Sequence, residues 1–247
     1  MMIYALNVAL MLAGCFMFYK LLLQKETFFP LNRFVLLGCL FLSFSLPLIP
    51  VPQQWSFRKA STEIQLSDAK NTVLKNESLP IADNVKPVTP APNTTKTSVF
   101  KEISPLQIMI WIYWLGVIIF GLNFLFQLCI LIYKSYARPF IQDGKFRIVE
   151  LSGEQAPCSF ANNIFINPDK YDWETYSQII LHEKIHIEQG HSYDIVLAEL
   201  ALIFQWFNPF AWFYRKAMED NLEFLTDNEL LTHSDIEPAS YQMSLVK

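Results

Sequence analysis

The stretch QIILHEKIHIEQG, residues 178–190, decides the fold of the C-terminal half of the chain. Its apolar residues recur at helical intervals, and within it His182 and His186 are four residues apart. Residues at this spacing share a helix face, so both imidazole rings can reach one metal ion, while Glu183 points toward the open position of that ion. Composition predicts roughly 0.004 chance copies of this pattern. We therefore interpret it as a zinc site rather than as two histidines on a solvated face.

The residues around this stretch predict a small domain of mixed secondary structure. Asp172 is a typical helix-capping residue, and Gly190 is a typical residue at a helix end, so the helix should lie between them. Upstream, residues 145–151 alternate apolar with polar side chains, as a half-buried strand does, and a second strand is expected at residues 163–166. The sequence thus indicates an α+β domain with a small sheet.

A zinc ion that promotes amide hydrolysis needs a third protein ligand and leaves a fourth position for water. His191 follows the histidine pair closely but lies beyond the predicted helix end. A further helix is expected to start at Pro209, and on it Glu219, Glu223 and Asp227 recur at intervals of four and share a face. The residues alone leave the choice among these candidates open.

The N-terminal half of the chain is apolar enough to cross a membrane three times. The whole chain is 52% hydrophobic and only 17% charged, well below the charged fraction of ordinary soluble domains. Residues 2–23, 34–50 and 106–133 are long apolar runs that predict transmembrane helices. Residues 51–105 between the second and third runs are rich in Ser, Thr, Asn and Pro and predict a flexible loop.

Basic residues near the predicted spans indicate their orientation. They are Lys20, Lys25 and Arg33 in the first connection, and Lys134 and Arg138 after the third span. Because cytoplasmic segments tend to carry such residues, we expect both segments to be cytoplasmic and the 51–105 loop to be extracytoplasmic, although that loop carries basic residues near its ends as well.

Two function classes are disfavoured by composition. A net charge of −4 provides no broad basic field, so direct nucleic-acid binding is not expected. The four cysteines form no C-x-x-C pair, which argues against a disulfide framework and a thiolate zinc site. The sequence before Cys15 resembles a lipoprotein processing box, but no positive charge precedes it and the apolar run continues past it, so we interpret the run as a span.

Two further segments carry expectations about packing and substrate. The apolar residues 195–207 are interpreted as packing on the membrane-facing side of the domain, with partial membrane insertion as the alternative. A strand edge near residues 160–166 could pair with an extended peptide substrate. His191 and Tyr193 are candidates for an additional hydrogen-bond donor at the site by proximity alone, although a structural role is the simpler interpretation for each.

The chain resembles the membrane-embedded antirepressor zinc metallopeptidases of the beta-lactam sensor-transducer (Bla/Mec receptor) type. The resemblance covers most of the chain and rests on the HExxH pattern at 182–186, FNPF at 207–210, Trp212, Tyr214-Arg215, and Glu223-x-x-x-Asp227. It implies that His182, His186 and Glu223 hold Zn²⁺ and that Glu183 is the catalytic base. It also implies that Asp227 is a carboxylate that orients a histidine ligand from behind.

The expected fold is therefore a mainly α membrane protein with three transmembrane helices and an α+β, zincin-like HExxH metallopeptidase domain containing a small sheet. The expected divisions are a transmembrane hairpin at 1–50, the loop at 51–105, a third span at 106–133 and the peptidase domain at 134–247. Members of the family usually continue into a fourth span and an external domain. The sequence here stops at Lys247, which indicates either a fragment or a short branch of the family.

The expected function is that of a membrane-anchored zinc endopeptidase of transmembrane signalling in the bacterial inner membrane. Its peptidase domain would be cytoplasmic and would cut a cytoplasmic protein such as a transcriptional repressor, or the chain itself. Two alternatives remain: a signalling scaffold with structural zinc and no proteolysis, and a quality-control protease with broad substrates. Expected partners are a protein substrate, membrane lipid and, as an open option, a second copy of the chain.

Overall fold

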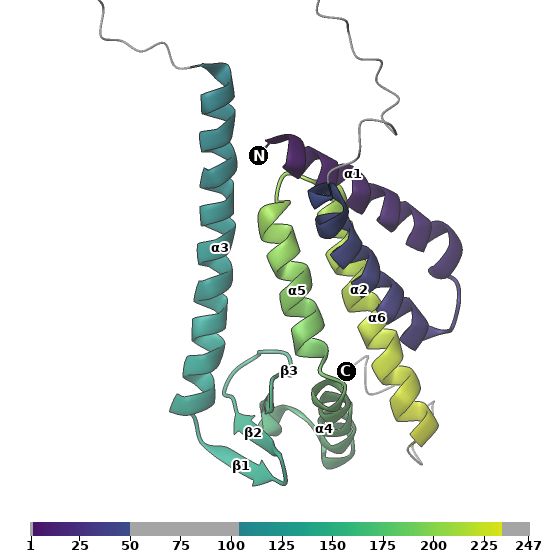
Figure 1. Cartoon of the computed structure of the whole chain (residues 1–247). Helices are drawn as coiled ribbons and strands as arrows, with labels where there is room; N and C mark the ends of the chain where they lie inside the picture. The colour runs from purple at the N-terminus through teal and green to yellow at the C-terminus, as the bar shows by residue number, and fades with distance from the viewer. Residues whose placement is uncertain (1, 50–103, 234–247) are drawn as a thin grey trace, which may run out of the picture. The chain divides into compact units, whose positions relative to one another are not determined.

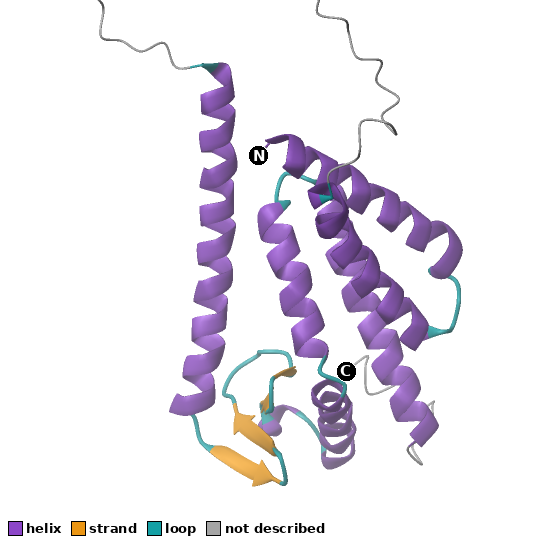
Figure 2. Ribbon diagram, viewed as in Figure 1, coloured by secondary structure: helices purple, strands orange, loops and turns teal. Residues whose placement is uncertain are grey.

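The structure, a computed structural model, describes residues 2–49 and 104–233 (Figure 1). Six α-helices and four short strands make up this part of the chain (Figure 2). The helices are α1 (Met2–Phe18), α2 (Phe29–Ser45), α3 (Pro105–Ala137), α4 (Trp173–Glu188), α5 (His191–Phe204) and α6 (Pro209–His233). The strands are β1 (Phe140–Asp143), β2 (Phe146–Glu150), β3 (Cys158–Phe160) and β4 (Asn163–Ile166). This composition confirms the expected fold class.

Within residues 2–49 and 104–233, three helical segments are long and apolar enough to cross a membrane: Met2–Leu23, Phe29–Leu48 and Pro105–Ala137. The first joins α1 to a π-helical turn, and the second joins α2 to a short 3₁₀ turn. The second segment begins five residues earlier than expected, because Pro30 is well suited to the first turn of a helix. The predicted loop at 51–105 falls almost wholly outside the described residues.

The helices α1, α2 and α6 share one apolar core. The buried side chains that form its centre include Leu12, Phe16, Leu36, Leu40, Met218 and Leu222. Two polar residues of α6 also bond to the backbone of α2: the Tyr214 hydroxyl donates to the Leu36 carbonyl, and the Asn221 amide donates to the Phe29 carbonyl at 3.2 Å. Helix α6, which carries Glu223, is therefore packed directly against the first two spans.

The third span contacts the connection between α5 and α6. The Trp206 indole donates a hydrogen bond to the Tyr113 carbonyl at 3.2 Å, and the Tyr113 hydroxyl donates to the Phe204 carbonyl at 3.1 Å. The Trp206 ring lies against Gly116 so closely that a Cβ atom there would be 2.1 Å from a ring carbon. A glycine is required at this point because any side chain would overlap the indole.

The four strands form one mixed sheet in the order β1-β2-β4-β3. β2 pairs in parallel with β4, and the other two pairings are antiparallel. The sheet packs on α4 through a core that contains Ile148, Ile164 and Ile180. The two predicted strands correspond to β2 and β4, whereas β1 and β3 were not predicted. Figure 1 shows the sheet and α4 at one end of the helices, next to the last turn of α3.

Candidate metal centre

Helix α4 holds His182 and His186 on one face. Its start is defined by Asp172, whose carboxylate accepts hydrogen bonds from the Thr175 amide at 2.9 Å and the Thr175 hydroxyl at 3.1 Å. After its last turn Gly190 adopts a positive φ of 69°, which a glycine tolerates without strain. Between these ends the two imidazole rings lie one turn apart, with their Nε2 atoms 3.0 Å from each other.

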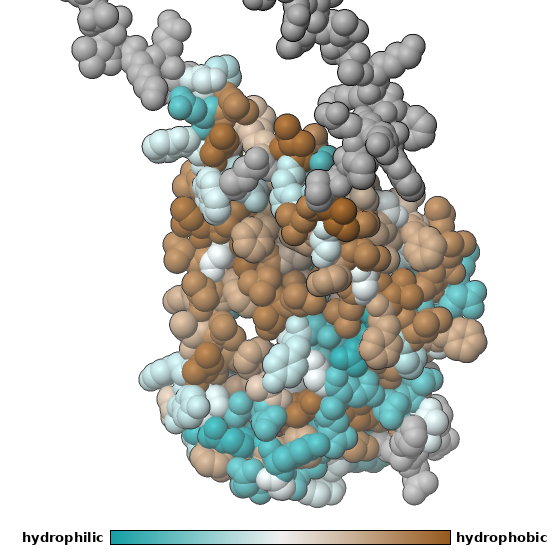
Figure 3. Space-filling view, in the orientation of Figure 1, coloured by the Kyte–Doolittle hydropathy of each residue, from teal (hydrophilic) through white to brown (hydrophobic). Residues whose placement is uncertain are grey.

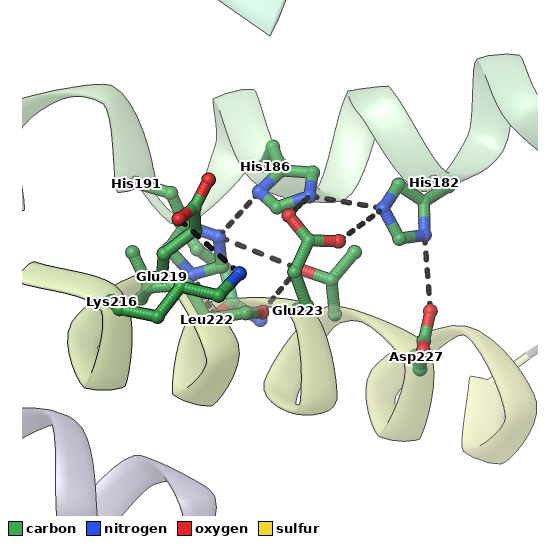
Figure 4. A network of polar contacts seen from close by, with 10 residues as sticks. His182, His186, His191, Lys216, Glu219, Leu222, Glu223 and Asp227 are labelled. Carbon is green, nitrogen blue, oxygen red and sulfur yellow. Dashed lines mark hydrogen bonds and ion pairs between the residues drawn. The ribbon is translucent and has the colours of Figure 1, made fainter. Parts of the chain in front are cut away.

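Helix α6 brings an acid to this histidine pair (Figure 4). Asn208 accepts a hydrogen bond from the Phe210 amide at 3.0 Å and so caps the start of α6. Further along α6, Glu223 places one carboxylate oxygen 3.4 Å from His182 Nε2 and the other 3.7 Å from His186 Nε2. One ligand atom from each of these three residues lies within 4.8 Å of the other two. Two imidazole nitrogens and a carboxylate oxygen are donors that a divalent transition metal accepts.

The second nitrogen of each imidazole also has a partner. His182 Nδ1 is 3.3 Å from an Asp227 oxygen, on the side of the ring away from Glu223. His186 Nδ1 is 2.8 Å from His191 Nδ1. In metal sites such contacts fix the tautomer and the orientation of the ligating ring. The structure thus places Asp227 behind one ring and His191 behind the other.

His191 is therefore next to the cluster, but on the Nδ1 side of His186 rather than among the converging Nε2 atoms. It is buried, its Nε2 is 3.1 Å from the Gln189 side chain, and the Thr226 hydroxyl is 3.4 Å from its Nδ1. The contacts of Thr226 and Gln189 were not predicted, and no local sequence pattern marks either residue. Tyr193 is 74% exposed and contributes nothing to this network.

Glu219, the third acid of the predicted stripe, is not drawn into the cluster. Its carboxylate lies 3.5 Å from Arg215 and 3.5 Å from Lys216 on its own helix. Figure 4 shows it beside Lys216, apart from the two rings that face Glu223. Of the three acids spaced by four residues, Glu223 lies between the histidines and Asp227 lies behind one of them.

The charges of the cluster are distributed unevenly. Burial lowers the pKa of His182, but its hydrogen bonds to Asp227 and Glu223 outweigh burial and raise this pKa to about 9. Burial and the nearby His182 lower the pKa of His186 to about 4, and burial and His186 lower that of His191 to about 3. The hydrogen bond from His182 lowers the pKa of Glu223. The proton favoured on His182 thus lies between the side chains of Asp227 and Glu223, and a bound cation would supply this positive charge in its place.

Glu183 lies beside the cluster on the buried side of α4. It is 8% exposed, and burial raises its pKa, while a hydrogen bond from the Ser159 side chain of β3 opposes this rise. Ser159 is a further residue that sequence reasoning missed. Its role depends on the position of β3, a three-residue strand that carries no clear sequence signal.

A cavity of about 600 Å³ opens over these residues. His182, Glu183, His186 and Glu223 line it together with parts of α3, β3, α5 and α6. The other lining side chains include Phe124, Gln127, Ser159, Glu199, Arg215 and Leu222. The candidate metal-binding residues therefore lie in the wall of this cavity.

The family model Peptidase_M56, described as BlaR1 peptidase M56, matches residues 1–247. No curated protein matches the chain.

Proposed function

Because the chain belongs to the BlaR1 peptidase M56 family of membrane-associated metallopeptidases, we propose that it is a zinc-dependent endopeptidase of transmembrane signalling. Its substrate is a cytoplasmic protein such as a transcriptional repressor, or the chain itself. One observation carries this proposal: His182, His186 and Glu223 converge from two helices within 4.8 Å, with the Glu183 carboxylate beside them in the same cavity.

The donor set fits zinc. His182 and His186 would hold the ion through Nε2, and Glu223 would hold it through its carboxylate, which leaves a fourth position free as in catalytic zinc sites. When bound, zinc activates a water molecule for attack on a peptide carbonyl and stabilises the developing negative charge.

The residues around the ligands have separate tasks. Glu183 takes the proton of the attacking water at a carboxylate oxygen and returns it to the leaving amine. Ser159 holds that carboxylate from β3. Asp227 and His191 contact the Nδ1 atoms of His182 and His186 and would keep the Nε2 atoms of these rings oriented for metal binding.

β3 is suited to bind the substrate backbone. It forms one edge of the described sheet, and its residues line the cavity beside His182 and Glu183. An extended peptide can add to such an edge as a further strand, because main-chain hydrogen bonds hold it whatever its side chains. This arrangement would place a peptide carbonyl close to the metal cluster.

We infer the orientation in the membrane from the contacts of Arg33. Its guanidinium bonds Asp194 at 2.7 Å and the Gln189 carbonyl at 2.8 Å, so the basic end of the first two spans lies next to the end of the metal-bearing helix. Since basic connections tend to remain in the cytoplasm, we place the metal cluster on the cytoplasmic side of a bacterial inner membrane.

The test is a Glu183→Gln variant of the full chain, purified in detergent. We expect its zinc content to match that of the wild type, because both imidazoles and Glu223 remain. Cleavage of unfolded casein and self-cleavage should both be lost, because the proton acceptor is gone. Zinc is measured by elemental analysis, and cleavage by gel and mass spectrometry.

Glu188→Gln is the matched control, since it makes the same chemical change on the same helix at an exposed residue paired with Lys145. It should keep both zinc and activity. Full cleavage by the Glu183→Gln chain would refute the mechanism. Signalling that persists without any cleavage would favour a scaffold with structural zinc.

A further inference from the structure

The hairpin made by α5 and the first turns of α6 is unusually apolar for a part of a catalytic domain. Between Ile195 and Tyr214 the only charged residue is Glu199, and its carboxylate is paired with Arg215. Helix α5 has 14 residues, too short by itself to cross a membrane of about 30 Å. The contacts of the hairpin with α1 and α2 nevertheless indicate how far it extends into the apolar layer that these helices would span.

The tip of the hairpin lies at the outer end of the first two spans. The Gln205 amide donates to the Ala5 carbonyl at 3.1 Å, and the Asn208 amide donates to the Ala9 carbonyl at 3.4 Å. Next to Ala5 in α1, the Tyr4 hydroxyl donates to the Phe44 carbonyl near the end of α2 at 2.8 Å. The tip is therefore level with the start of α1 and the end of α2.

The base of the hairpin lies at the opposite end of the same spans, where Arg33 near the start of α2 bonds Asp194 in the first turn of α5. From Arg33 to Phe44, α2 advances by about 17 Å at 1.5 Å per residue. The hairpin thus runs alongside more than half of the thickness of the apolar layer that these spans would occupy.

The exposed surface of the hairpin is apolar. It comprises six side chains that are 40–57% exposed: Leu197, Leu200, Phe204, Phe207, Trp212 and Phe213. Two of them also contact the spans, Trp212 through Phe120 of α3 and Phe213 through Phe16 of α1. Figure 3 shows that hydrophobic side chains predominate over α3, the region of α5 and the first two spans, whereas hydrophilic side chains predominate at the end that holds the sheet and α4. The exposed face of the hairpin thus continues the surface of the spans.

Most polar groups of the hairpin have partners, as a bilayer demands. Its backbone is helical except for the turn at 205–208, where the Gln205 and Asn208 amides bond backbone carbonyls, and its charged pair is internal. The side-chain amides at its tip donate to carbonyls of α1, although Gln205 Oε1 has no hydrogen-bond partner. We propose that residues 195–214 are inserted in the bilayer as a re-entrant helical hairpin whose exposed face contacts lipid acyl chains. In the described part of the chain the membrane then holds the three spans and this hairpin, and the candidate metal cluster lies at the membrane surface, since His191 joins the cluster to the base of the hairpin.

The test uses the unmodified full chain in vesicles of phosphatidylethanolamine and phosphatidylglycerol. A phosphatidylcholine with a photoreactive diazirine at the end of an acyl chain is added and illuminated, and the labelled tryptic peptides are identified by mass spectrometry. Peptide 185–215 contains the hairpin, and peptide 1–20 contains α1. Peptide 171–184 is the control, because its Trp173 is 81% exposed but lies on α4, outside the proposed membrane region.

We expect label in peptide 185–215 at a level comparable with that in peptide 1–20, and none above background in peptide 171–184. A second probe with its diazirine next to the headgroup separates insertion from a hairpin that lies flat on the membrane. Label in 185–215 from the headgroup probe alone would overturn the proposal. Absence of label from both probes would also overturn it, and would show that water or a second copy of the chain covers this face.

Discussion

At the scale of single residues, the candidate site depends on how the two histidine rings are held. The spacing of His182 and His186 could be predicted because a helix turn brings residues four apart onto one face. The choice of acid could not be predicted in the same way, since Glu219, Glu223 and Asp227 are all four apart and share a face. It follows from the offset between α4 and α6, which is a tertiary property.

The contacts of Ser159 and Thr226 could not be predicted from the sequence either, because they too depend on tertiary structure. Each contacts the site from an element that lies far along the chain from α4, on β3 or α6. A single hydroxyl in a short strand or on a long helix has no distinguishing pattern in the sequence. Only the pairing of β3 with β4 and the packing of α6 against α4 bring these hydroxyls to Glu183 and His191.

The contact between Asp227 and His182 leads to a prediction about metal affinity. Asp227→Ala removes the carboxylate 3.3 Å from Nδ1 and frees the ring to rotate. Loss of such an orienting carboxylate lowers metal affinity by roughly 10- to 100-fold. Zinc affinity is measured by competition with a chelating dye. Asp220→Ala is the control, because Asp220 pairs with the exposed Lys216 on the same helix, and its affinity should equal that of the wild type.

At the scale of secondary structure, the buried strands were predictable and the exposed ones were not. β2 and β4 contain buried apolar residues in a recognisable pattern, whereas all four residues of β1 are exposed and β3 has only three residues. The dipeptide Asp143-Gly144, with a glycine φ of 57°, is the one local signal for the turn between β1 and β2. Helix α5 was not assigned because it is apolar on nearly every face, which hides the helical period.

The close approach of Trp206 to α3 predicts opposite effects for two glycine substitutions in one helix. Gly116→Ala places a Cβ atom 2.1 Å from the indole, so the ring must move and its bond to Tyr113 is strained. We expect a loss of about 1–3 kcal/mol in unfolding free energy, as is usual for overpacking.

Gly121→Ala is the matched control, since its Cβ atom would lie 3.9 Å from the Ile203 side chain, an ordinary contact. The higher helix propensity of alanine should make this variant neutral or stabilise it by up to about 1 kcal/mol. Thermal unfolding in detergent micelles, followed by circular dichroism, compares the two. Equal effects of both substitutions would contradict the assigned packing of α3 against Trp206.

At the scale of the whole molecule, metal removal should loosen the chain without unfolding it. The core of α1, α2 and α6 contains none of the metal-cluster residues, so helix content should survive a chelator at 25 °C. The link between α4 and α6 should weaken, because zinc would bind only where both helices are in place. At a free zinc concentration one hundred times its dissociation constant, binding adds about 2.7 kcal/mol of stability.

The measurement is the thermal unfolding midpoint as a function of free zinc. It should rise with zinc for the wild-type chain and stay constant for His182→Ala, which lacks one of the ligands. If the unfolding midpoint of the wild-type chain is the same with added zinc and with chelator, the cluster is not a metal site.

The attachment of the sheet to α3 has a consequence for how a stimulus could reach the cavity. The Ser135 hydroxyl in the last turns of α3 donates to the Asn163 side chain of β4 at 2.8 Å, and Arg147 of β2 donates to the Ser135 carbonyl at 3.2 Å. Glu223, by contrast, belongs to a helix bound to α1 and α2. The cavity is thus lined on one side by the sheet, which is attached to α3, and on the other side by α6, which is attached to α1 and α2. A movement of α3 along or about its axis would therefore change the width of the cavity.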